Sequence, residues 1–417
     1  MTNKIKFLYF NKNKISEFLF FLLVLLLPTQ SGKHFFLDFS FIRGVRVDYL
    51  SLVLYSTDVI ILILSLVNFS LIKKTLSENK KLLSIVGVLF FANGLFSSQK
   101  IIFLYHLLKY IELYLVFLVA QKTTSKQRFI VMALTIGASI ELFLSVAQLY
   151  FKSSLQGIFY FLGERIVNLS LADIAKASIN GVEFLRPYGT FSHPNSMAGF
   201  YLLIYFFVFS MSISSKNKEF YWLRLLLLFL SGALVVISFS KIAITTFCVV
   251  SLLSLFFKKT TSCKFCLFSR IVVLAVLMTI VLSAHTDPLT IQKRLLLLQH
   301  GMLIIGSHLL WGTGLGQYLY FEKDMQMTYP FFFLQPIHNS FLLFFAETGI
   351  LLATAIIIYI FETYKKHIQR HEVLICALVV ILTGMFDHYW ITLQQNWLLL
   401  GVVFGLLSNN NVMQERG

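Results

Sequence analysis

Two short polar segments mark the places where long apolar runs begin. Residues 186–195 have the sequence RPYGTFSHPN, and residues 338–342 have the sequence HNSFL. Both contain residue types that bind anions, transfer protons or hold a ligand by hydrogen bonds. In a chain that is otherwise largely apolar, polar groups gathered at the mouths of membrane spans are the first candidates for chemistry.

The composition sets the elements that must position these segments. Hydrophobic residues make up 57% of the chain and charged residues 13%, with a mean hydropathy of +0.78, which excludes a soluble globular protein. Apolar runs long enough to cross a bilayer must be helical, because lipid offers backbone groups no partner. We predict an all-α polytopic membrane protein, with residues 1–417 as a single membrane domain of about twelve transmembrane helices. The expected spans are 16–28, 49–72, 82–98, 101–120, 129–151, 195–213, 225–239, 241–257, 271–284, 339–361, 373–386 and 397–408.

The basic residues predict the orientation. Of the 35 lysines and arginines, 22 fall in the two terminal segments and in every second loop, while 12 fall in the longer opposite loops, counting Lys241 at the edge of its span. Positive residues are enriched on the cytoplasmic side of membrane proteins. We therefore predict a multi-pass protein of the cytoplasmic (inner) membrane with both termini cytoplasmic. The net charge of +16 then reflects topology and contact with anionic lipid, not nucleic-acid binding.

Two outer loops, 152–194 and 285–338, are longer than simple connections need to be. In the second loop, Pro288 starts a predicted helix that ends near Ile305. Polar residues interrupt this helix, and counting it as a span would reverse every later loop. We expect it to lie at the outer membrane boundary, with Arg294 at the level of lipid headgroups.

Three features imitate known signals. The basic N-terminus before an apolar stretch resembles a signal peptide, but an uncleaved first span is the better interpretation. The Gly-x-Gly-x-Gly at 312–316 follows no predicted strand, so we expect a flexible turn and not a nucleotide site. Cys263 and Cys266 form a CxxC without a second pair, which argues against a zinc or redox site.

Taken in order, the motifs resemble those of the bacterial O-antigen ligase and O-antigen polymerase superfamily. The resemblance rests on Arg-x-x-Gly-Thr-Phe-x-His-Pro-Asn at 186–195, and on an outer-loop arginine followed by an interfacial helix and Gly-x-Gly-x-Gly. It also rests on His-Asn-Ser-Phe-Leu at 338–342 with Glu347 and Gly349 soon after, and on Phe-Asp-His-Tyr-Trp at 386–390.

This resemblance implies a metal-independent glycosyltransferase without a cofactor, acting on the outer face of the cytoplasmic membrane in surface-polysaccharide biosynthesis. Such enzymes take a glycan from a polyprenyl diphosphate lipid and pass it to a hydroxyl of a glycan, lipid or protein acceptor. Arg186 and Arg294 match the family's functional positions, and their guanidinium groups suit a diphosphate. His338 matches the catalytic position, where an imidazole suits activation of a hydroxyl. Ligation and polymerisation both remain open.

His193, Asn195 and Asn339 are further candidate substrate-binding residues, because they belong to the same two motifs. The alternative for His193 and Asn195 is a role in shaping the turn into their span. For Asn339 the alternative is a cap on the helix that follows.

Four ionisable residues within the expected spans receive other assignments. Glu347 lies nine residues after His338, about half a revolution around the helix, so we assign it to helix packing. Lys109 and Glu112 are spaced to pair with each other. Asp58 remains a functional candidate without a partner.

The main alternative function is a multi-span transporter of polysaccharide or lipid-linked sugar. Transporters often show repeat symmetry and polar sites near the middle of the membrane, whereas here the polar residues gather at the outer mouths of the spans. A peptidoglycan-type polymerase is a second alternative, and a non-catalytic scaffold explains the arginine-bearing outer loops least well.

Overall fold

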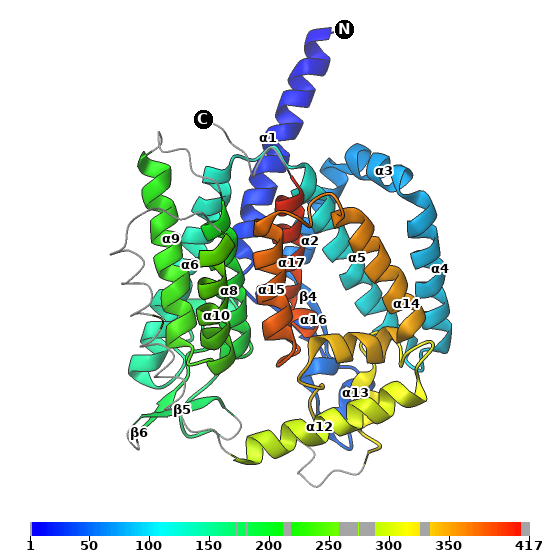
Figure 1. The fold of residues 1–417 in the computed structure, drawn as a ribbon, viewed down its shortest axis with the longest axis vertical. Helices are drawn as coiled ribbons and strands as arrows, with labels where there is room; N and C mark the ends of the chain where they lie inside the picture. The colour runs from blue at the N-terminus through cyan, green and yellow to red at the C-terminus, as the bar shows by residue number, and fades with distance from the viewer. Residues whose placement is uncertain are drawn as a thin grey trace.

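The computed structural model describes residues 2–171, 174–179, 182–211, 218–257, 274, 288–325 and 334–409, and these residues are mostly helical (Figure 1). The helices are α1 (Thr2–Leu26), α2 (Ser56–Val67), α3 (Phe69–Glu78), α4 (Lys80–Phe96), α5 (Lys100–Lys122), α6 (Gln127–Phe151), α7 (Ile158–Phe161), α8 (Pro194–Ser210), α9 (Lys218–Ile237), α10 (Lys241–Phe257), α12 (Pro288–Ser307), α13 (Tyr318–Glu322), α14 (Ser340–Tyr364), α15 (His371–Gly384), α16 (Tyr389–Thr392) and α17 (Gln394–Ser408). Three small antiparallel sheets pair β1 (Gly32–Phe35) with β4 (Leu52–Tyr55), β2 (Phe41–Ile42) with β3 (Val45–Arg46), and β5 (Lys176–Ile179) with β6 (Val182–Leu185).

Several of these helices identify a membrane protein. Four of the described helices, α5, α6, α9 and α14, are each long and apolar enough to cross a bilayer. The pair α2 and α3 passes the same test together but bends by 78° between its two parts, and α8, α10 and α15 are shorter apolar helices. Twelve spans therefore remain a prediction. The expected span 271–284 lies, apart from Leu274, outside the described residues.

The predicted span 49–72 begins too early. A 3-10 turn (Asp48–Leu50) and β4 occupy its first residues, and helix starts only at Ser56. The carboxylate of Asp58 accepts a hydrogen bond of 2.9 Å from the backbone N–H of Tyr55, which caps the new helix. A short apolar run does not distinguish a strand from a helix, which explains the error.

Asp58, for which the sequence predicted no partner, forms an ion pair with Lys109. The ammonium of Lys109 lies 2.6 Å from Asp58 and 3.1 Å from Glu112, so the predicted Lys109–Glu112 pair is confirmed and becomes part of a buried three-residue cluster. Gln394, at the start of α17, donates a further hydrogen bond of 2.6 Å to Asp58. This cluster ties α2, α5 and α17 together.

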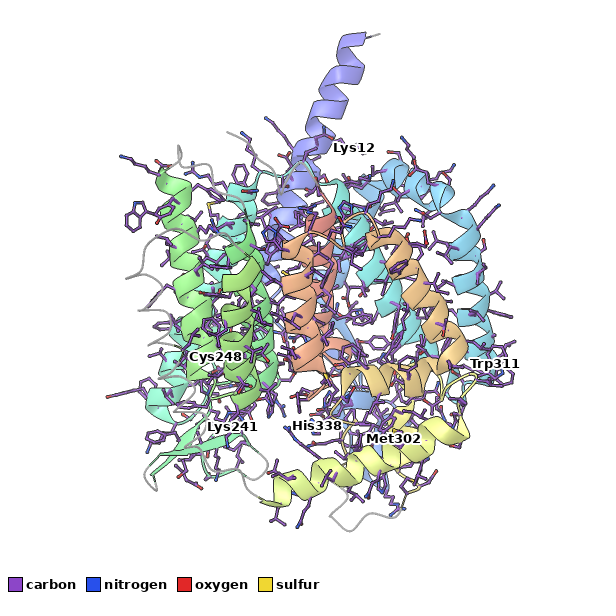
Figure 2. The ribbon with its side chains drawn as sticks, in the orientation of Figure 1. Lys12, Lys241, Cys248, Met302, Trp311 and His338 are labelled. Atoms are coloured by element: carbon purple, nitrogen blue, oxygen red, sulfur yellow. The ribbon has the colours of Figure 1, made fainter. Side chains whose placement is uncertain are left out.

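The two ends of the helix bundle differ in content. Both chain termini lie at one end, and α12 and the β5–β6 hairpin lie at the other (Figure 1). Lys12 belongs to the terminal end, whereas His338 and Lys241 lie at the opposite end (Figure 2). Both polar motifs therefore meet on one side of the bundle, next to α12.

Helix α14 is broken at Gly349, which has φ 68° and ψ 170°, so its first turns run across the bundle and the remainder runs along it (Figure 1). The turn 312–316 packs directly into this break. A Cβ at Gly349 would lie 2.4 Å from the backbone nitrogen of Gly312, so both positions require glycine. The flexible turn expected at 312–316 is instead held in place, since Thr313 N–H donates to the carbonyl of Ala346 and Gly314 N–H donates to the carbonyl of Glu347.

Candidate functional site

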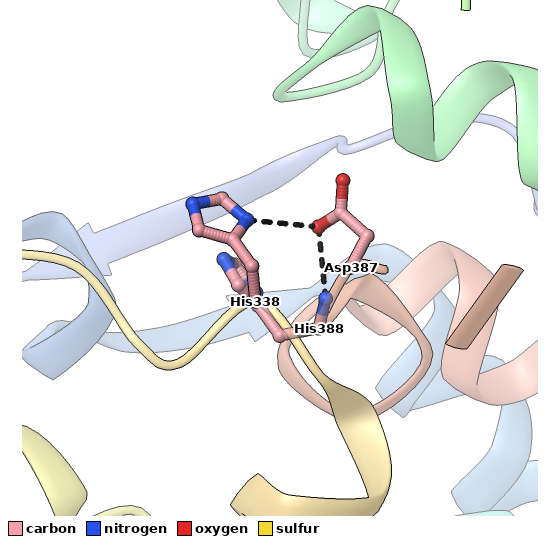
Figure 3. Close-up of side chains that lie close together, drawn as sticks. All are labelled: His338, Asp387 and His388. Atoms are coloured by element: carbon pink, nitrogen blue, oxygen red, sulfur yellow. Dashed lines mark hydrogen bonds and ion pairs between the residues drawn. The ribbon is translucent and has the colours of Figure 1, made fainter. Parts of the chain in front are cut away.

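His338 lies immediately before α14. Asn339 caps that helix, its side-chain oxygen accepting hydrogen bonds of 3.0 Å from the N–H groups of Phe341 and Leu342. The cap fixes the direction in which the chain enters the helix and so places the His338 imidazole. Its Nδ1 lies 3.8 Å from Oδ1 of Asp387, an ion-pair contact longer than a hydrogen bond (Figure 3).

Asp387 comes from the turn between α15 and α16, far from His338 in sequence. Its backbone carbonyl accepts hydrogen bonds from the N–H and the hydroxyl of Ser340, at 3.1 and 2.8 Å, which fastens this turn to the start of α14. Its Oδ1 accepts from the backbone N–H of His388 at 2.8 Å (Figure 3). Its Oδ2 accepts from Nδ2 of Asn195 at 3.0 Å.

Asn195 links this carboxylate to Arg186. The Nη2 of Arg186 donates to Oδ1 of Asn195 at 2.7 Å, and its Nε donates to the carbonyl of Ser238 at 2.9 Å. The Nδ1 of His193 accepts from the backbone N–H of Asn195 at 3.1 Å and so caps α8. The first polar motif therefore forms a continuous hydrogen-bonded path, Arg186 to Asn195 to Asp387, that ends beside the second motif.

Burial sets the charges along this path. Burial, with Arg186 nearby, lowers the pKa of His193 to about 3, and burial lowers that of His388 to about 4, so both rings are neutral near pH 7. Burial also lowers the pKa of Arg186 to about 10, which leaves it charged. Burial alone would raise the pKa of Asp387. The imidazoles around it, of which His338 contributes most, instead hold this pKa well below its usual range. Asp387 is therefore a carboxylate in contact with His338.

A cavity of about 1120 Å³ opens in front of these groups, and His193, Asn195, His338 and Asp387 all line it. Arg294, from α12, lines it from the other side and is half-buried. In the part of the chain that the structure describes, the Arg294 guanidinium makes no hydrogen bond or ion pair. Arg186 does not line the cavity, and two of its three guanidinium nitrogens are already bonded to protein.

Residues 226–357 match the family model described as O-antigen ligase. This match supports membership of the chain in the O-antigen ligase superfamily. The matched range includes Arg294 and His338, while Arg186, Asn195 and Asp387 reach this O-antigen ligase domain from outside it. No curated protein matches the chain.

The site also contains side chains of the kinds that bind metal ions. The possible ligand atoms of His338, Asp387 and His388 all lie within 4.8 Å of one another. Ligands on one zinc ion lie closer, roughly 3.5 Å apart for bonds of about 2.1 Å. Both Asp387 oxygens already accept hydrogen bonds, and Nδ1 of His388 is bonded to Thr392 at 2.8 Å. The three residues would have to exchange these contacts to hold a metal.

The structure distributes the predicted site residues unevenly. It gathers His338, Asn195, His193 and Arg294 around one cavity, with Arg186 behind Asn195, and it gives Asn339 a capping role, its side-chain nitrogen donating to the carbonyl of Met385 at 3.1 Å.

Three further residues at the site, and a fourth nearby, were not predicted individually from the sequence. Asp387 and His388 belong to a motif noted in the sequence, but nothing in the spacing indicates that they meet His338. Arg165 from the first long outer loop lines the cavity with its Nη1 donating to the carbonyl of Ser192 at 2.9 Å. Lys241, the first residue of α10, lies close enough to Arg186 for the two positive charges to interact.

Proposed function

We propose that this protein is a membrane glycosyltransferase of the ligase or polymerase type, which moves a glycan from a polyprenyl diphosphate carrier to an acceptor hydroxyl. One observation carries the proposal. Arg294, which has no partner among the described residues, lines the same cavity as His338 and the carboxylate of Asp387 beside it. The first suits a diphosphate leaving group, and the second suits removal of a hydroxyl proton.

In this chemistry the acceptor oxygen forms a bond to the anomeric carbon of the donor sugar, while the bond from that carbon to the diphosphate oxygen breaks. His338 takes the acceptor proton. Asp387 holds the imidazole in position and stabilises its positive charge, as a buried carboxylate does in hydrolase triads. Arg294 binds the diphosphate and stabilises the charge that develops on it. Arg294 supplies positive charge that a divalent cation often provides, so we propose that transfer needs neither metal nor cofactor.

The setting follows from the orientation predicted by the basic residues. With both termini in the cytoplasm, the cavity lies at the outer face of the cytoplasmic membrane, and α12 lies along its surface. A polyprenyl diphosphate there keeps its chain in lipid and its headgroup in the cavity. The acceptor is a glycan, a lipid-anchored sugar or a protein, and residues 1–417 form one membrane domain with the outer loops 152–194 and 285–338.

Purified protein in lipid nanodiscs, incubated with a defined lipid-linked glycan and candidate acceptors, tests the proposal. A longer lipid-linked product indicates a polymerase, and glycan on a different anchor indicates a ligase. Turnover should persist in excess EDTA. His338→Ala should lower the rate by about 10²–10⁴ at unchanged donor binding. His338→Gln separates a base from a positioning group, because glutamine forms hydrogen bonds but does not accept the proton.

Transport without any new glycosidic bond, or wild-type turnover by both His338→Ala and Arg294→Ala, would contradict the proposed function. Turnover that stops with EDTA and returns with magnesium or manganese would contradict the metal-free part alone.

A further inference from the structure

A carboxyl group and an imidazole meet inside the contact between α12 and α13, at the end of the bundle that contains His338 (Figure 1). Oε1 of Glu322, on α13, lies 4.0 Å from Nδ1 of His300, on α12. Apolar side chains of both helices pack in the same region, among them Ile304 of α12 and Leu319 of α13. The side chain of Glu322 has no exposed surface, and that of His300 retains 8%. The fold therefore places two ionisable groups in surroundings that disfavour charge.

Neither group has a hydrogen-bond partner among the residues that the structure describes. Both side-chain oxygens of Glu322 and Nδ1 of His300 are without one. A buried carboxylate that accepts no hydrogen bond is costly, because nothing replaces the water that it has lost. A proton removes this charge, and the O–H of a protonated Glu322 can donate to Nδ1 of His300 after an approach of about 1 Å.

The groups on α13 and α14 supply no counter-charge to Glu322. Burial, and then Glu322 itself, raise the pKa of the Tyr318 phenol well above its usual range, so this ring stays neutral. Glu347 of α14 is acidic and accepts a hydrogen bond from the backbone N–H of Tyr318. The ammonium of Lys323 lies 4.8 Å from the centre of the Tyr320 ring.

The remaining titratable and cationic neighbours have other partners. Nη2 of Arg43, in the turn between β2 and β3, donates to the backbone carbonyl of Lys323, and Nδ1 of His308 lies 3.2 Å from a backbone carbonyl of α12. Within the described residues, His300 is thus the one group at ion-pair distance from Glu322. Burial raises the pKa of Glu322 well above its usual range and lowers that of His300. At neutral pH the pair accordingly consists of a protonated carboxyl group and a neutral imidazole.

The position of Arg294 depends on the same helix. Arg294 and His300 both belong to α12 and both line the cavity. They are separated by about 9 Å along the helix axis, so a shift of α12 at His300 moves Arg294 as well. Loss of the proton would leave a buried carboxylate without a partner, and the contact would open to hydrate it. Because the folded-state pKa of Glu322 is raised, the contact is complete at lower pH and is lost as the pH rises through that pKa.

We propose that Glu322 and His300 hold one proton between α12 and α13 and thereby position Arg294 at the cavity. Glu322 is a positioning residue, since it acts through α12 and does not line the cavity. The shared proton is independent of any reaction, whereas the positioning of Arg294 for a diphosphate rests on the proposed function. On the predicted orientation, the contact responds to the pH of the outer solution.

Glu322→Gln tests the proton directly, because glutamine has nearly the same shape and donates a hydrogen bond at every pH. In lipid nanodiscs, the melting temperature of the wild type should fall relative to that of Glu322→Gln as the pH rises from about 7 to about 10. Over this range the dissociation constant for a polyprenyl diphosphate without a glycan should rise roughly three- to tenfold more in the wild type than in Glu322→Gln. Glu183→Gln, at an exposed ion pair with Lys176, is the matched control and should follow the wild type. Titration of the lipid itself is common to all variants and cancels in the comparison.

Replacing both partners by leucine gives a second test that does not depend on glutamine being tolerated. His300→Leu alone leaves the carboxyl group without an acceptor and should lower the melting temperature. His300→Leu combined with Glu322→Leu gives an apolar contact, which should be close to the wild type in stability near neutral pH and insensitive to pH. Losses that simply add in the double variant would show that the two groups do not interact.

The outcomes separate the proton, the positioning and the proposed function. The same pH dependence of the melting temperature in the wild type and Glu322→Gln would refute the shared proton. A difference in melting temperature with no difference in the dissociation constant would refute the positioning of Arg294 alone. Binding of the lipid diphosphate that Arg294→Ala leaves unchanged would instead overturn the proposed function, and the comparison of melting temperatures does not depend on that result.

Discussion

Arg186 and Arg294 carry the same charge but differ in their hydrogen-bond partners, and we therefore expect them to have different roles. Arg294 has a guanidinium without a protein partner in the described structure and faces the cavity, so it is free to bind a ligand anion. The Nε and Nη2 groups of Arg186 already donate hydrogen bonds to Ser238 and Asn195. It therefore acts on the cavity mainly through Asn195 and Asp387.

This difference predicts two kinetic signatures. Arg294→Ala should raise the donor KM by about 10- to 100-fold with little loss of stability, because it removes charge-assisted bonds to the ligand only. Arg186→Lys should instead lower kcat and cost about 1–3 kcal/mol of folding free energy, because lysine cannot make both bonds. Steady-state kinetics and thermal unfolding measure the two effects. Arg128→Lys, at an exposed ion pair with Glu219, is the control, and identical behaviour of the two site variants would refute this division.

Asp387→Asn is the corresponding test of the carboxylate beside His338. Asparagine keeps the size of the side chain but cannot stabilise an imidazolium, so kcat should fall on the order of 10²–10⁴-fold with the donor KM nearly unchanged. Asp38→Asn, at an exposed position between β1 and β2, should have no effect. Turnover of the Asp387 variant within a fewfold of wild type would show that His338 works without this partner.

The sequence predicted most of these residues because they are polar groups at the starts of spans. It did not predict how they connect. The Asp387–His338 contact depends on the turn between α15 and α16 meeting the start of α14, and no local pattern reports that long-range contact. Asn339 belongs to the motif for a different reason, since its side chain is used by the helix cap.

At the scale of elements, the break in α14 sets the direction of the first turns of that helix, which follow His338. These turns run across the bundle because the chain bends at Gly349. Helix periodicity over 339–361 gave one straight span, since a glycine within an apolar helix does not by itself predict a break. The predicted helix from Pro288 to Ile305 corresponds to α12, which begins at the same proline but continues through Gly306 to Ser307.

Gly349→Ala should therefore destabilise the protein and impair transfer together. Alanine at φ 68° is strained, and its Cβ would lie 2.4 Å from the nitrogen of Gly312, so we expect a loss of roughly 2 kcal/mol or more. Gly87→Ala, in α4 with nothing within 4 Å of the added carbon, should be neutral or slightly stabilising. Unfolding midpoints in detergent compare the two, and an equally stable, equally active Gly349 variant would show that the break is not required.

At the scale of the whole molecule, the opposite ends of the bundle are predicted to face opposite sides of the membrane. Asp324 is exposed shortly after α13, which lies at the same end of the bundle as α12 (Figure 1). Lys12 is exposed at the terminal end (Figure 2). In a background with Cys263 and Cys266 replaced by serine, Asp324→Cys should react with a membrane-impermeant maleimide in intact cells. Lys12→Cys should react only after permeabilisation. The reverse pattern would place the cavity in the cytoplasm and remove the basis for an outer-face reaction.

The contact between Ser340 and Asp387 also orders events during synthesis of the protein. During synthesis, α8 and α14 enter the membrane before the turn that contains Asp387. Until that turn is inserted, Asn195 and Ser340 lack Asp387 as their hydrogen-bond acceptor. On the proposed function, Arg294 is already in place at that stage, but His338 lacks the carboxylate of Asp387. We therefore expect a nascent chain to be inert toward its donor until its last helices are inserted, and activity to appear only when the fold is complete.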